Sequence, residues 1–126
     1  MGFRVAIAGA TGNVGREMLD ILAERNFPAD EVVALASSRS VGKEVSFGDK
    51  TLTIKNLETN DFSTTDLCLM SAGGSVSQKW SPMIGQQGCL VIDNSSAWRY
   101  NSDVPLIVPE VNPEAITDFS KKNIIA

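Results

Sequence analysis

Three glycines near the start of the chain, Gly9, Gly12 and Gly15, have the type and spacing expected of a phosphate-binding turn. Gly9 suits a tight turn after an apolar strand, Gly12 lets the backbone approach an anion closely, and Gly15 lets the following helix pack tightly. The free N–H groups at the start of that helix would face the phosphates. The spacing G-x-x-G-x-x-G, between an apolar strand and an amphipathic helix, therefore predicts binding of a dinucleotide.

A second candidate site follows the apolar run at residues 32–36, where Arg39 has serines on either side at Ser37 and Ser40. The acidic residues nearest the position that would bind the ribose of NAD precede that run, at its other end. An arginine with flanking hydroxyls can instead bind a dianionic 2′-phosphate through charge-assisted hydrogen bonds. The pattern favours NADP over NAD, and the alternative interpretation is a solvated surface loop.

Two more polar loops follow apolar runs, at 71–74 and 93–99. Gly73 would let the cofactor pass close to the backbone, although a simple turn into the next helix explains it equally well. Asn94 could hydrogen-bond a nicotinamide carboxamide, and Arg99 could hold an anionic group of a substrate. A single arginine in a loop is more often only solvated, so this assignment stays open on residue chemistry alone.

The elements that must position these loops alternate between helices and apolar strands. This alternation predicts an α/β fold, a Rossmann-like doubly wound sheet that is mainly parallel, with helices on both faces. Alternating polar and apolar residues over 41–55 add a small β-hairpin excursion, and Asn112 could cap a further helix. The other expected helices span 13–26 and 77–87, and the other expected strands span 3–8, 32–36, 66–70, 89–93, 106–108 and 123–126.

Composition excludes several kinds of chemistry. The chain has 126 residues, a formal net charge of −4 and no histidine. Without a basic stripe we expect no nucleic-acid partner, and without a long apolar run we expect no membrane span. The lack of histidine excludes a Ser-His-Asp triad and a histidine-ligated metal site, and we expect no metal. Cys68 and Cys89 lie within apolar runs, which is typical of inert core thiols and compatible with the cytoplasm.

Taken together, these motifs resemble bacterial aspartate-semialdehyde dehydrogenase. The matching segments run in order from one end of the chain to the other, and DNSSAWR followed by VPEVN is the most specific of them. Two alternatives remain, namely a fragment of an N-acetylglutamyl-phosphate reductase and a non-catalytic NADP-binding sensor module. The segments are GATGNVG (9–15), SSRS (37–40), SAGGS (71–75), DNSSAWR (93–99) and VPEVN (108–112).

The resemblance implies an oxidoreductase that uses NADPH to reduce aspartyl phosphate to aspartate semialdehyde, in the biosynthesis of lysine, diaminopimelate, threonine and methionine. The reverse reaction consumes inorganic phosphate and passes through a thioester on a catalytic cysteine. Full-length members are homo-oligomers. By motif, the residues that match NADP-binding positions are Thr11, Gly12, Asn13, Val14, Arg39 and Ser40, and Arg99 matches the arginine that binds phosphate.

The resemblance also implies that residues 1–126 are an incomplete NADP-binding domain. The family's nucleophilic cysteine lies in an N-x-N-C-type segment directly after the strand that begins at Asn123. The catalytic histidine, the dimerisation region and a returning C-terminal helix would also lie beyond Ala126. We therefore expect no catalytic residue in this chain and no turnover by the chain alone, while its oligomeric state stays open.

Overall fold

The structure, a computed structural model, describes residues 2–126, except for the side chains of Asp118 and Lys121. These residues form a sheet of six parallel strands and a separate hairpin. In chain order the described strands are β1 (Phe3–Ala8), β2 (Ala29–Ala36), β3 (Glu44–Phe47), β4 (Lys50–Thr53), β5 (Lys55–Asn56), β6 (Leu67–Met70), β7 (Leu90–Asp93) and β8 (Ile124–Ile125). Of these, β3 and β4 form a separate two-stranded sheet. In the large sheet their order is β5-β2-β1-β6-β7-β8. This arrangement confirms the parallel sheet predicted from the alternation of strands and helices.

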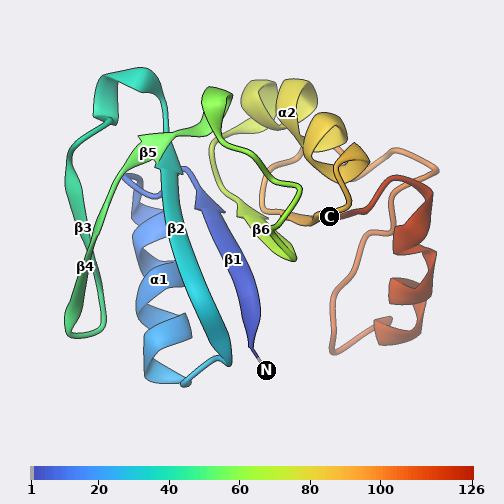
Figure 1. The fold of residues 1–126 in the computed structure, drawn as a ribbon. Helices are drawn as coiled ribbons and strands as arrows, with labels where there is room; N and C mark the ends of the chain where they lie inside the picture. The colour runs from blue at the N-terminus through green and yellow to red at the C-terminus, as the bar shows by residue number, and fades with distance from the viewer. Residues whose placement is uncertain (1) are drawn as a thin grey trace.

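Helices cover both faces of this sheet. Successive residues of β1 point to opposite faces, so Val5 belongs to one hydrophobic cluster and Ala6 to the other. Helix α1 (Asn13–Glu24) packs on the first face through Leu19, and helix α2 (Gly74–Gln86) packs on the second through Ile84. The fold is therefore a doubly wound α/β layer structure (Figure 1).

The predicted hairpin consists of β3 and β4, which pair antiparallel and stand beside α1 (Figure 1). Val45 of β3 and Ile54, just after β4, join the buried cluster on the α1 face. At the hairpin turn, a Cβ on Gly48 would lie 3.2 Å from the Cβ of Ala23. The hairpin therefore runs along α1, with its turn near the C-terminal end of that helix.

The chain order of the strands creates a switch point between β1 and β6. From β1 the chain builds outward through β2 to β5, and it then returns to the other side of β1 to form β6, β7 and β8. The connections from β1 to β2 and from β5 to β6 therefore lead to opposite sides of β1. They diverge at the carboxyl ends of β1 and β6, where Ala8 and Met70 pair. In open α/β sheets this is where ligands bind.

The segment before β8 differs from the predictions. Residues 106–108 do not form a strand, although Ile107 N–H and the Pro105 carbonyl each bond the backbone of Ala126. The helix after Asn112 is the 3₁₀ helix η3 (Pro113–Lys121). The Asn112 side chain does not cap it, because its Oδ1 accepts from Val108 N–H and its Nδ2 donates to the Leu106 carbonyl.

No helix in the described part of the chain is long and apolar enough to cross a membrane.

Candidate functional site

The glycine turn is held by close backbone contacts on three sides. Gly9 has φ +82°, and a Cβ there would lie 2.6 Å from the carbonyl oxygen of Ser71, so no other residue fits without displacing the loop after β6. The N–H groups of Gly9 and Ala10 both donate to the Leu35 carbonyl of β2. A Cβ on Gly15 would clash with the carbonyl oxygen of Gly9. The turn is thus packed between β2, β6 and the first turn of α1.

The start of α1 carries no side-chain cap. Gly12 is the N-cap residue and makes no side-chain hydrogen bond to the helix, and the first turn contains no acidic residue. Backbone N–H groups at such an end have no intrahelical partner and carry a partial positive charge. Asn13 and Val14 are exposed on this first turn. The end of α1 is therefore open to an anionic ligand.

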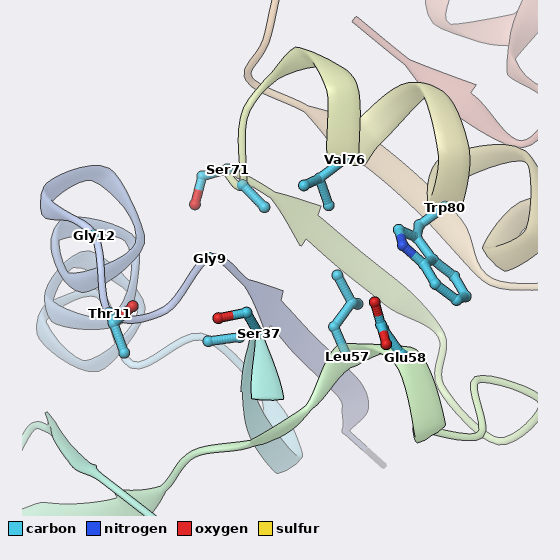
Figure 2. Close-up of a pocket in the computed structure, with 11 residues that line it drawn as sticks. Gly9, Thr11, Gly12, Ser37, Leu57, Glu58, Ser71, Val76 and Trp80 are labelled. Atoms are coloured by element: carbon cyan, nitrogen blue, oxygen red, sulfur yellow. The ribbon is translucent and has the colours of Figure 1, made fainter. Parts of the chain in front are cut away.

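A cleft of about 310 Å³ opens next to this turn, over the switch point of the sheet. Figure 2 shows Thr11 and Ser37 on one side of it, and Val76 of α2 and Leu57 facing each other on the other. Most of its walls are apolar, which suits a flat heterocycle. Its lining residues are Gly9, Thr11, Gly12, Ala36, Ser37, Leu57, Glu58, Ser71, Ala72, Val76 and Trp80.

A polar groove of about 710 Å³ lies between α1 and the hairpin and shares Thr11 with the cleft. Ser40 and Lys43 line one wall, and Arg16 of α1 lines the other. The Nε and Nη2 of Arg16 both donate to the Thr11 carbonyl, at 3.2 and 3.1 Å. The cleft and the groove therefore meet at Thr11, whose carbonyl this arginine holds.

Not every residue predicted from the sequence lines these cavities. Gly9, Thr11, Gly12 and Ser37 line the cleft and Ser40 lines the groove. Arg39 is exposed in the 3₁₀ turn η1 (Ser38–Ser40) and lines neither cavity, although it lies in the chain between Ser37 and Ser40. Gly73 caps α2 with φ +92° next to the cleft, and Gly15 lies buried under the turn.

Asn94 and Arg99 lie together in a third hollow of about 600 Å³ beyond the carboxyl end of β7. The Nη2 of Arg99 donates to the Asn94 carbonyl at 3.4 Å. Asp93, only 5% exposed, accepts from the Oγ of Ser95 at 2.6 Å and from its N–H at 3.2 Å. These bonds fix the start of the loop that carries the arginine.

The end of the same loop is tied to helix α2. Trp98 packs against the cluster on the α2 face, and its Nε1 donates to the Oγ of Ser77 at 3.0 Å. Ser77 and Ser81 are fully buried, and their hydroxyls lie 2.7 Å apart. Tyr100, two residues further on, is by contrast 98% exposed. The loop with Arg99 is therefore anchored by one aromatic residue.

The comparisons with known proteins assign the fold and the turn to a family. Residues 4–119 match the family model described as semialdehyde dehydrogenase, NAD binding domain. The chain belongs to this family.

Relatives of this semialdehyde dehydrogenase domain include aspartate-semialdehyde dehydrogenase of Aquifex aeolicus, 58% identical over the whole of this chain and 37% of the relative. Aspartate semialdehyde dehydrogenase II of Vibrio cholerae, solved in complex with ASA, matches with a TM-score of 0.96 and 53% identity over 100% of this chain and 41% of that one. The Candida albicans enzyme, solved with NADP, matches with a TM-score of 0.75 and 25% identity over 99% and 42%. The chain thus spans about two-fifths of these proteins.

The sequence motifs do not include several residues that line the cleft or the groove. Val76 and Trp80 are four apart on α2, and helical periodicity could have indicated that they share a face. Leu57 and Glu58 follow β5, a two-residue strand with no pattern of its own. Lys43 gave no signal, because only the docking of the hairpin brings it to the groove.

The two cysteines of this semialdehyde dehydrogenase domain are confirmed as core thiols. Cys68 and Cys89 are fully buried, and neither forms a disulfide. Burial is the main cause that raises the pKa of both thiols, and that of Cys89 reaches about 12. A thiol that keeps its proton is a poor nucleophile, so neither side chain is suited to attack a substrate.

Proposed function

We propose that this chain binds NADP as the cofactor-binding domain of an aspartate-semialdehyde dehydrogenase. One observation carries the proposal: the turn from Gly9 to Gly15 opens the uncapped end of α1 into a cleft at the switch point of a parallel sheet. That arrangement offers N–H donors and a positive dipole end to a pyrophosphate. The relatives named above, one of them solved with NADP, support the choice of cofactor.

The residues present fit such a cofactor. The pyrophosphate would lie against the N–H groups of the first turn of α1, beside Thr11 and Gly12. Its adenine would enter the apolar part of the cleft, between Leu57 and Val76, and the 2′-phosphate would reach the serines at the end of β2. Binding there would place Ser37, Arg39 and Ser40 near the phosphate, and Gly73 along the path of the cofactor.

The nicotinamide half would extend toward β7, where Asn94 and Arg99 share a hollow. NADPH supplies a hydride to an acyl group when it is bound. We propose that Asn94 orients the carboxamide and that the Arg99 guanidinium binds the phosphate of the substrate by charge-assisted hydrogen bonds. The bonds from Asp93 to Ser95 and from Trp98 to Ser77 hold this loop in place before substrate arrives.

We extend this proposal to the whole protein. We propose that the full-length protein is a cytoplasmic homo-oligomer that reduces aspartyl phosphate to aspartate semialdehyde through a cysteine thioester. Both cysteines of this chain are buried in the core, so we propose that the nucleophile comes from a part of the full-length protein outside these residues.

Titration calorimetry of the chain with NADPH and NADH tests the cofactor assignment. We expect NADPH to bind more tightly, because only it carries the 2′-phosphate. Arg39→Asp should weaken NADPH binding and leave NADH binding unchanged, since the new carboxylate repels only the extra phosphate. Lack of binding by either nucleotide, or equal affinity for both, would contradict the proposal.

A further inference from the structure

The groove between α1 and the hairpin holds a cation that the sequence motifs do not include. Lys43 lines this groove together with Ser40 and Thr11. Thr11 also lines the cofactor cleft, so a phosphate group at the end of β2 would lie where the two cavities meet. Arg39, the cation that the motif predicts for this phosphate, lines neither cavity.

The backbone at Lys43 is fixed on both sides. Its N–H donates to the Ser40 carbonyl at 3.1 Å, and its own carbonyl accepts from Ile54 N–H at 2.8 Å. The preceding residue, Gly42, donates from its N–H to the Ile54 carbonyl at 3.0 Å. Lys43 is therefore held at the junction of η1 and the hairpin, whereas its exposed side chain is free to reach along the groove.

Side chains of both charges line this groove. Lys43 and Arg16 lie at the end next to the glycine turn, because Arg16 is in the first turn of α1 and β3 starts beside it. Asp20 lies one turn further along α1, whereas Glu44 follows Lys43 directly at the start of β3. An anion at the junction with the cofactor cleft would therefore be attracted by Lys43 and Arg16 and repelled by Glu44, with Asp20 further away.

We propose that Lys43 is the main cation that distinguishes NADP from NAD in this chain. Its ammonium binds the 2′-phosphate as a point charge at the end of the groove next to the glycine turn, with the hydroxyl of Ser40 as a further donor. Arg16 adds charge but spends two of its N–H groups on the Thr11 carbonyl. This inference rests on the proposed function and adds a residue that determines its specificity.

The test compares two small probes that differ only in the phosphate concerned, 2′,5′-ADP and 5′-AMP, by titration calorimetry with the full chain. Lys43→Ala should weaken binding of 2′,5′-ADP by about tenfold or more and leave 5′-AMP unchanged, because a charge-assisted bond is lost only with the former. Lys43→Arg keeps the charge and should retain most of the affinity. Lys50→Ala, an exposed lysine at the other end of the same hairpin, serves as the matched control and should change neither.

The possible outcomes separate the two proposals. Equal loss for both probes in Lys43→Ala would assign Lys43 a structural role and overturn the inference. Unchanged binding of 2′,5′-ADP, with a loss only in Arg39→Ala, would also overturn it while leaving NADP binding intact. Wild-type protein that binds both probes equally, or neither, would overturn the NADP assignment and the inference together.

Discussion

The indole Nε1 of Trp98 donates a 3.0 Å hydrogen bond to the Oγ of Ser77, and this bond joins the loop of Arg99 to helix α2. Helix α2 also forms a wall of the cofactor cleft through Val76 and Trp80. The proposed phosphate-binding loop and the proposed nucleotide cleft are therefore connected by a polar contact whose acceptor, Ser77, is fully buried. Its acceptor is kept in a defined position by the hydroxyl of Ser81.

Removal of that contact should loosen the loop. Trp98→Phe keeps most of the packing but removes the donor, and we expect a loss of about 1 kcal/mol in the free energy of unfolding. Urea denaturation measures this loss, and amide hydrogen exchange at 95–99 should become faster. Tyr100→Phe is the control, because Tyr100 is 98% exposed and should tolerate the change. Equal stability of Trp98→Phe and wild type would show that the bond does not contribute.

Two glycines with similar backbone angles allow strain and steric clash to be measured separately. Gly9 has φ +82° and Gly42 has φ +91°, but only a Cβ on Gly9 meets other atoms, the nearest at 2.6 Å. Gly42→Ala should cost about 1–2 kcal/mol from the left-handed backbone alone. Gly9→Ala should cost clearly more, because the loop after β6 must also move. Thermal or urea unfolding compares the two, and similar losses would argue against close packing of the turn.

Stability should fall at alkaline pH because of the buried thiols. The pKa of Cys89 is about 12 in the folded chain, compared with an ordinary value of 9.0. Between these values the folded thiol keeps a proton that the unfolded thiol has lost, so the unfolded state binds fewer protons. The contribution is complete below pH 9 and is lost as the pH rises toward 12. Urea midpoints from pH 8 upward measure the decline, which Cys89→Ala should make shallower; an unchanged slope would contradict the assignment.

Arg99 should bind phosphate if the proposed function is correct. Arg99 is exposed, and among the described residues its guanidinium makes one long hydrogen bond, 3.4 Å, to the Asn94 carbonyl, so most of its N–H donors remain for a ligand. Arg99→Ala should weaken binding of inorganic phosphate about tenfold, followed by NMR shifts of the amides at 93–99. Arg25→Ala, at the far end of α1, is the control. Equal phosphate affinity in both variants would remove Arg99 from the site.

The strands that carry the site were predictable because their signal is local. The run from Val32 to Ala36 is apolar at every position, as expected of a strand covered on both faces, and it lies within β2. The glycine turn was predictable for the same reason, since Gly9 and Gly15 meet requirements set within a few residues of chain. The hairpin of β3 and β4 was also predicted correctly, because alternation of polar and apolar residues along a strand is a local pattern that needs no distant partner.

Elements whose role depends on distant partners were missed or misread. β5 has only two residues, and its pairing with β2 gives it an identity that its own sequence lacks. Residues 106–108 were expected to be a strand, but Pro105 and Pro109 flank them, and their backbone groups bond Ala126, Val111 and Asn112 rather than a strand. Asn112 was expected to cap a helix, yet its amide bonds the preceding loop at both ends. In each case the local sequence was compatible with more than one set of hydrogen-bond partners.

By itself, the sequence determined the class of fold, the glycine turn between β1 and α1, the family and the core position of Cys68 and Cys89. Each of these depends on periodicity, glycine spacing or order of motifs within short stretches of chain. Only the tertiary structure decided that Arg39 lines neither the cleft nor the groove, that Lys43 lines the groove, and that Trp98 ties the loop of Arg99 to α2. The physical reason is that these relations join side chains across separate elements. Their distances are set by how the hairpin and α2 pack on the sheet, which no local pattern encodes.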